Sequence, residues 1–198
     1  MLPPVQAPPC VRGRAGGVLG RLLVVLVVVS ALASVAALET AAAGGPHAFS
    51  GTRGITRMRG LEPQLLAAIN DFRRAQDLGP LRLNRALAVA AGQHSLSMVE
   101  HGYFEHSSLD GSPFWKRVKA AYPRNGRRWG VGENIAWASP GLSARKALEL
   151  WLASPPHRQN LLSRAWHEIG LGAVRAVAGG VYNGRVVTIL TADFGVRR

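Results

Sequence analysis

The sequence predicts an α/β protein of the α+β type, a three-layer α-β-α sandwich with about four helices and a small antiparallel sheet. Two observations lead to this fold. Apolar residues recur at helical spacing in several segments between residues 61 and 153, and the C-terminal third changes to the alternation that is typical of strands. Because an amphipathic helix and a half-buried sheet must each cover an apolar face, these elements are expected to pack in layers.

The first two helices have clear start signals. Residues 62–76 form the first, with Pro63 in the first turn, where the missing N–H costs no helical hydrogen bond. Its apolar positions recur at helical spacing: Leu65, Leu66, Ile69 and Phe72. After a Gly-Pro break, Asn84 is expected to cap the second helix, because its side chain can accept hydrogen bonds from amides of the first turn. One face of that helix collects these residues: Leu87, Ala91, His94 and Met98.

Two shorter helices follow. The third is expected to start at Ser112, with Pro113 at its first helical position. The fourth has Ser143 as its cap and turns Trp151 inward. The Ser-Pro-Pro sequence at residues 154–156 is expected to end it.

The C-terminal third of the chain is expected to form strands. Apolar residues alternate over residues 169–173 and again over residues 187–194. The pairs at residues 179–180 and 183–184 contain glycine or asparagine, which accept positive φ, so these two strands are expected to form an antiparallel hairpin. A further short strand is expected at residues 134–138.

Residues 1–43 have the pattern of an export leader. A segment with three arginines precedes an uncharged apolar stretch, and small-x-small sites follow it, so the leader is expected to be a signal peptide or, if retained, an N-terminal membrane anchor. The protein is therefore expected to be secreted or otherwise extracytoplasmic. Residues 44–60 are expected to form a linker and residues 61–198 the folded domain. Cys10, the only cysteine, lies in the leader, which leaves the domain without a disulfide.

The formal net charge of +13 bears on the choice of partner. An excess of arginine favours anionic partners such as a lipid surface or a cell-wall polymer. The basic residues are scattered, with no Arg/Lys run longer than two and no nucleic-acid-binding motif. Nucleic acid is therefore not an expected partner.

Three polar segments supply the candidate site residues, His106, Glu133 and His157. Loops on a rigid scaffold are where sites are usually built. From the residues alone each also has a plain structural interpretation, as a hydrogen-bonded histidine or as a carboxylate that accepts from nearby amides. His94, on the apolar helix face, is expected to be a core histidine bonded to a backbone carbonyl, outside the site.

Six stretches occur in a fixed order between about residue 64 and residue 195: AAGQHSLSM, YFEHSSLDG, VGENIAW, WLASPPHRQNLL, IGLGAV and DFG. In this order they resemble the bacterial branch of the CAP superfamily, the group of cysteine-rich secretory, antigen 5 and pathogenesis-related proteins, whose domain is also called SCP. The resemblance implies an α-β-α fold with a cleft that holds two histidines and two acidic residues.

By this resemblance His106 and His157 take the places of the two histidines, and Glu133 that of one acid. The other acidic position falls near Ser154, so the set is incomplete, and Glu105 is the substitute to consider. Two imidazoles and one carboxylate can ligate Zn²⁺ or another divalent cation, as members of the family do. The alternative is a buried hydrogen-bonded network that ties three loops together.

Three functions remain open at this point. The sequence favours an exported binding module whose cleft or basic surface engages a lipid, a wall component or another protein. The second is a metal-dependent hydrolase of envelope or extracellular polymers, acting through the candidate residues; no other common hydrolase mechanism has its nucleophile here. The third is a structural protein of the envelope.

Overall fold

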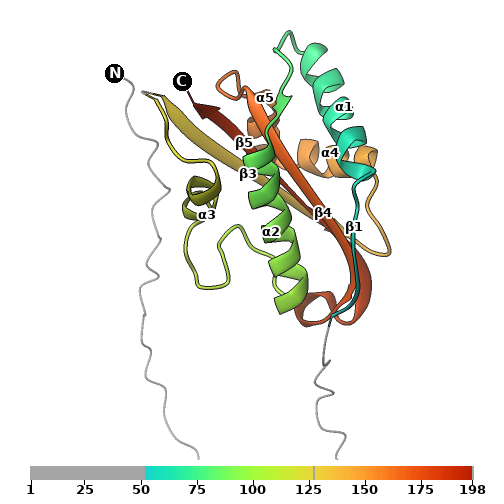
Figure 1. The fold of residues 1–198 in the computed structure, drawn as a ribbon. Helices are drawn as coiled ribbons and strands as arrows, with labels where there is room; N and C mark the ends of the chain where they lie inside the picture. The colour runs from blue at the N-terminus through green and yellow to red at the C-terminus, as the bar shows by residue number, and fades with distance from the viewer. Residues whose placement is uncertain (1–51, 127, 198) are drawn as a thin grey trace, which may run out of the picture. The chain divides into compact units, whose positions relative to one another are not determined.

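The computed structural model describes residues 52–126 and 128–197. Within them, five helices lie on the two faces of a five-stranded sheet, which confirms the predicted α+β fold (Figure 1). The predicted leader, residues 1–43, lies outside the described residues, as does the first part of the predicted linker.

The sheet has one long hairpin at its centre. Its strand order is β1-β4-β5-β3, with these bounds: β1 Arg53–Arg57, β4 Glu168–Ala178, β5 Arg185–Arg197 and β3 Trp129–Ala138. The three pairings along this path are antiparallel, and the short β2 (Arg82–Leu83) adds a parallel pairing at the start of β4. The predicted hairpin is β4–β5, and positive φ occurs in its turn at Gly180, Asn183 and Gly184.

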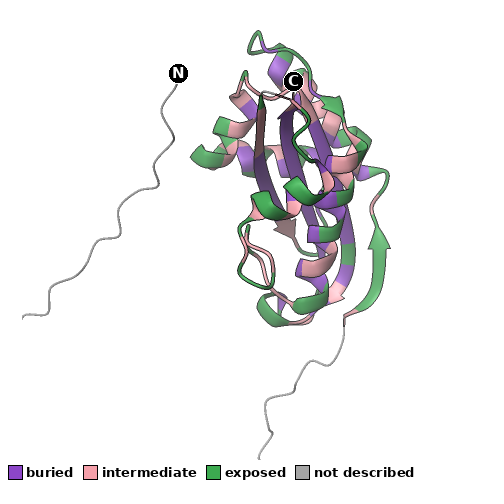
Figure 2. Cartoon of the chain, turned by 60° about the vertical axis from the view of Figure 1, so that its left-hand side comes forward, coloured by how far each residue is buried: buried purple, intermediate pink, exposed green. Residues whose placement is uncertain are grey.

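The helices form the two outer layers. Helices α2 (Arg85–His101) and α3 (Phe114–Ala121) cover one face of the sheet. The other face carries α1 (Leu61–Arg74), α4 (Ala144–Ala153) and α5 (Pro155–Leu162), and the larger core cluster lies there. Figure 2 shows the central strands of the sheet as a largely buried layer between helices whose outer sides are exposed, while the edge strand β1 is exposed.

Helix α2 lies unusually close to the sheet. A Cβ atom added to Gly172 on β4 would lie 2.2 Å from the backbone nitrogen of Gly92 on α2. Glycine on both elements therefore permits backbone contact where side chains would otherwise separate the layers. The loop that follows α2 is consequently held next to the same sheet face, and this loop carries His106.

The predicted helix caps are largely confirmed. The Asn84 side chain accepts hydrogen bonds from the amides of Ala86 and Leu87, at 2.9 and 3.2 Å, and Ser143 caps α4. Helix α3 starts at Phe114, two residues after Ser112, with Pro113 just outside its first turn.

Two elements differ from the sequence-based expectation. The Ser-Pro-Pro segment does end α4, but Pro155 also begins α5, so the prediction of four helices was one short for the described residues. A proline suits the first turn of a helix as well as it ends the preceding one. Residues 53–57, expected in the linker, form the edge strand β1, whose five exposed residues show no alternation.

No helix of the described part of the chain is both long enough and apolar enough to cross a membrane.

Candidate functional site

Glu133 is the buried centre of the predicted site. It lies in the middle of β3, where both neighbouring residues are also buried, and its side chain has 0% exposure. The β3–β5 register places it directly opposite Asp193. A carboxylate removed from water in this way requires donors or a shared proton to remain in the fold.

His106 comes to Glu133 from the loop between α2 and α3. Its Nδ1 donates to Glu133 Oε1 at 2.8 Å, while 47% of its side chain stays exposed. The ring therefore spans from the buried carboxylate to the surface. With Nδ1 engaged, Nε2 is the ring nitrogen that remains for a ligand.

His157 reaches the same place from α5, at the edge of the sheet. Its ring centroid lies 5.8 Å from that of His106. Burial, and then the positive charge of His106, lowers the pKa of His157 below its ordinary value. The structure thus brings the three sequence-predicted residues together, with Glu133 in the interior and the two imidazoles above it.

Two asparagines fix α5 against β3. Asn134 donates from Nδ2 to the carbonyl of His157 at 3.0 Å, and Asn160 donates to the carbonyl of Glu133 at 3.1 Å and to Asn134 Oδ1 at 2.8 Å. A Cβ atom on Gly132 would come within 2.9 Å of the Asn160 side chain, so glycine leaves room for this contact. The position of His157 therefore follows from a bonded strand–helix junction.

Arg117 on α3 is a member of the cluster that sequence reasoning missed. Its guanidinium forms an ion pair with Glu133 Oε2 and donates to Ser108 Oγ at 3.1 Å, and its side chain is only 13% exposed. Together His106 and Arg117 engage both carboxylate oxygens of Glu133. The sequence held no signal for this pairing, since an arginine on a short amphipathic helix usually faces solvent.

Asp193 is the second missed residue, and it is fully buried. Among the described residues no donor reaches either of its carboxyl oxygens. Burial, and then the negative charge of Glu133, raises the pKa of Asp193 well above its ordinary value, although Arg117 opposes this. The shift favours the protonated form of Asp193, whose proton can bridge to Glu133. The signal that could have revealed this residue in the sequence is an acidic side chain within the apolar alternation of β5.

Two other expectations concern nearby residues. His94 is buried, and its Nε2 bonds the backbone carbonyl of Glu105 at 2.9 Å, as expected for a core histidine. Burial lowers the pKa of His94 to about 4. The Glu105 side chain is exposed, so it does not replace the missing acid of the cluster.

The donor set was tested for a metal ion such as Zn²⁺. The described residues contain no group of three or more His, Cys, Asp or Glu side chains arranged to hold one. The chemical reason lies in Glu133, whose fully buried carboxylate accepts from His106 and Arg117. The cluster as built is a hydrogen-bonded network with an imidazole surface.

Known structures and sequences resemble this chain over most of the described residues. An extracellular protein of Bacillus anthracis that contains an SCP domain aligns with a TM-score of 0.55 and 27% identity, over 71% of this chain and 41% of that chain. An outer surface protein of Borrelia burgdorferi aligns with a TM-score of 0.51 and 19% identity, over 68% of this chain and 90% of that chain, and supports the fold alone.

Two curated Bacillus subtilis proteins match in sequence. YkwD is 30% identical over 118 residues, which is 58% of this chain and 43% of YkwD. The membrane protein YlbC is 31% identical over 114 residues, or 58% of this chain and 32% of YlbC. The chain thus spans less than half the length of either relative. Residues 66–194, more than half of the chain, match the cysteine-rich secretory protein family, and the chain therefore belongs to this family, the CAP family.

Proposed function

We propose that this CAP-family chain is an exported binding module, and that its ligand contacts the imidazole surface formed by His106 and His157 above Glu133. The observation that carries the proposal is the engagement of both Glu133 oxygens by His106 and Arg117. Such a carboxylate orients its neighbours, and because its side chain is fully buried, its remaining lone pairs are not open to a metal or a water molecule from the surface.

The same observation argues against the metal-dependent hydrolase. That function requires an open coordination site with enough ligands and a free general base. In the cluster the buried Glu133 carboxylate is paired with Arg117, and a raised pKa favours the protonated form of the neighbouring acid, Asp193.

The expected ligand is anionic or rich in hydrogen-bond acceptors. His157 can donate one ring N–H, and His106, whose Nδ1 serves Glu133, can accept at Nε2 or, when its ring is protonated, donate from it. The net charge of +13 attracts the same class of partner. Head groups of an envelope lipid and units of a wall polymer both meet these requirements.

Export is the second half of the proposal. Its support is the leader pattern of residues 1–43 and the similarity to an extracellular SCP-domain protein of Bacillus anthracis. A fusion of residues 1–60 to a reporter enzyme that is active only outside the cytoplasm tests it. Activity that disappears when residues 22–38 are deleted supports export, and equal activity of both fusions contradicts it.

Binding is tested by sedimentation of the full chain with isolated wall sacculi and with phosphatidylglycerol vesicles. The double variant His106→Gln/His157→Gln is compared with His101→Gln, which changes an exposed histidine on α2. We expect the double variant alone to lose pelleting. Pelleting that is equal in all three proteins, and that salt abolishes, would instead favour a structural envelope protein held by net charge.

A further inference from the structure

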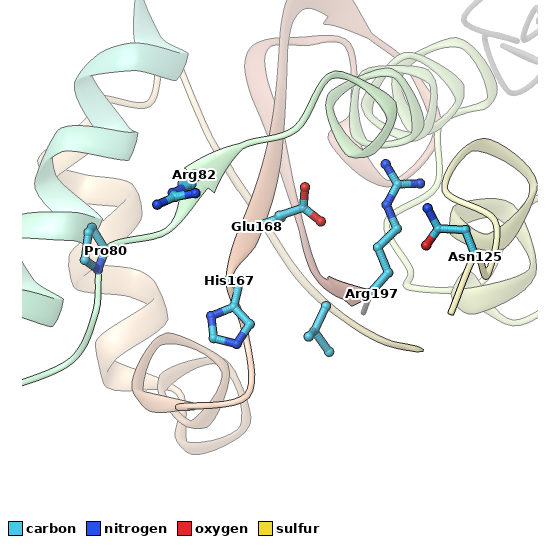
Figure 3. A pocket seen from close by; sticks show the side chains of 7 residues that line it. Pro80, Arg82, Asn125, His167, Glu168 and Arg197 are labelled. Carbon is cyan, nitrogen blue, oxygen red and sulfur yellow. The ribbon is translucent and has the colours of Figure 1, made fainter. Parts of the chain in front are cut away.

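An open pocket of about 460 Å³ lies at the end of the sheet where β2 and β4 begin and β5 ends. Figure 3 shows its polar lining, with Arg82 and Arg197 on opposite sides of Glu168. The wall is completed by these residues: Pro80, Asn125, His167 and Val196. None belongs to the His106 cluster. Arg197 is four residues beyond Asp193 on β5, or about 13 Å along an extended strand.

The two arginines are not neutralised inside the pocket. Neither Arg82 nor Arg197 has an ion-pair partner among residues 52–126 and 128–197. Glu168 directs its oxygens elsewhere: Oε1 accepts from Asn84 Nδ2 at 2.7 Å, and Oε2 accepts from the Tyr122 hydroxyl. The pocket therefore keeps at least one net positive charge even with His167 neutral.

Arg197 is also held in a defined orientation. The carbon of its guanidinium lies 4.1 Å from the centre of the Tyr122 ring. The chain of contacts from Asn84 through Glu168 to Tyr122 fixes that ring, and burial followed by the hydrogen bond to Glu168 raises the pKa of Tyr122, so that its hydroxyl stays a donor. A stacked guanidinium loses little further freedom when it binds an anion, and its planar fork can donate two parallel hydrogen bonds to one oxyanion.

The backbone that carries the other side of the pocket is equally fixed. The amide of Arg82 donates to the carbonyl of His167 at 2.9 Å, and the amide of His167 donates to the carbonyl of Gly195 at 3.1 Å. Arg82 and Glu168 are also register partners in the β2–β4 pairing. Positive charge thus converges on the pocket from two rigid strands.

We propose that this pocket binds a phosphate ester of a small polyol or sugar. Cationic groups on two sides suit a tetrahedral oxyanion, whose oxygens point in several directions, better than a planar carboxylate. The volume exceeds what a phosphate ion alone requires, and the amide of Asn125 in the wall can hydrogen-bond to a ligand hydroxyl. This site goes beyond the proposed function, because it shares no residue with the His106 cluster.

The test is calorimetric titration of the full chain with sn-glycerol 3-phosphate. We expect one-to-one binding that weakens by at least about tenfold in Arg82→Gln/Arg197→Gln, because charge-assisted hydrogen bonds are lost. The matched control is Arg175→Gln/Arg185→Gln, which removes the same charge from exposed positions toward the far end of β4 and β5. Equal weakening in both double variants, or a folded wild type that binds neither the ester nor phosphatidylglycerol vesicles, overturns the proposal.

Further arms identify the source of the ester and the role of geometry. If phosphatidylglycerol vesicles bind only when Arg82 and Arg197 are present, and the soluble ester does not bind, the ligand is a lipid head group. If the soluble ester binds and the vesicles do not, the ligand is a soluble or polymer-borne ester. Arg197→Lys keeps the charge without the fork, and wild-type affinity in this variant contradicts the positioned guanidinium. His106→Gln/His157→Gln should bind the ester normally, so failure here and failure of the proposed function are separable.

Discussion

Replacing the buried Asp193 by asparagine should stabilise the protein at neutral pH. Asp193 is fully buried, its raised pKa favours the protonated form, and no donor among the described residues reaches its carboxyl oxygens. In the unfolded chain an aspartate ionises with a pKa of about 3.9. Folding must therefore return a proton to Asp193 whenever the pH exceeds that value. In the Asp193→Asn variant the side-chain amide would present an N–H to Glu133 without requiring a proton.

The sign and size of the effect follow from proton linkage. Above about pH 4 the native state binds more protons at Asp193 than the unfolded state does, so this residue lowers the free energy of unfolding as the pH rises, until the pH reaches the native pKa. The slope is at most about 1.4 kcal/mol per pH unit. Between pH 5 and pH 7 the stability difference between Asp193→Asn and wild type should therefore grow by up to about 2.8 kcal/mol.

Urea unfolding of both proteins at pH 5, 6 and 7 measures this difference. Titrating groups common to both proteins largely cancel in the comparison, although the proton belongs to the pair of Glu133 and Asp193. Asp77→Asn, at an exposed position, should stay within about 0.5 kcal/mol of wild type at each pH. A stability difference for Asp193→Asn that stays constant from pH 5 to pH 7, or a destabilised variant at pH 7, would refute the reasoning.

Three further outcomes are expected. Glu133→Gln should lower the free energy of unfolding by about 3 kcal/mol, because it leaves the nearly buried Arg117 without its ion-pair partner; equal urea midpoints for variant and wild type would contradict this. Gly172→Ala should lower the free energy of unfolding by about 3 kcal/mol or more, because its Cβ would meet the backbone of Gly92. Gly79→Ala, with open space around it, should be nearly neutral, and thermal unfolding of both variants measures the difference. Titration with Zn²⁺ should give no one-to-one binding; a stoichiometric heat that disappears in the double variant of the two cluster histidines would restore the metal site.

Local signals were sufficient for most of the fold. The cap at Asn84 was predictable because a capping side chain bonds amides two and three residues away, which makes it a property of the sequence itself. The β4–β5 hairpin was predictable from alternation and from a turn that accepts positive φ. Strand β1 was not, because all of its residues are exposed at the sheet edge and its pairing depends only on β4.

The residues of the candidate site also differ in how far the sequence could predict them. His106, Glu133 and His157 stand in recognisable motifs, so a resemblance could select them before any coordinates were known. Arg117 lies outside these motifs, and Asp193, although it opens the DFG stretch, was not linked to the site by the resemblance. Their roles arise from tertiary geometry, since α3 must pack across β3 and the β3–β5 register must align two carboxyls. Neither relation can be read from spacing along the chain.

Arg117 and Asp193, which the sequence analysis did not place in the site, determine the chemistry of the three residues that it did place there. Without Arg117 and Asp193, two histidines and a glutamate form an incomplete metal site. With them, the Glu133 charge is balanced by Arg117, a raised pKa favours the protonated form of Asp193, and a lowered pKa favours the uncharged form of His157. The surface presented to a ligand is then made of two imidazole rings over an interior whose charges are balanced. Because burial lowers the pKa of His157, this ring gains its proton only below the ordinary histidine range, and a ligand recognised by this surface through negative charge should bind more tightly as the pH falls through that lower range.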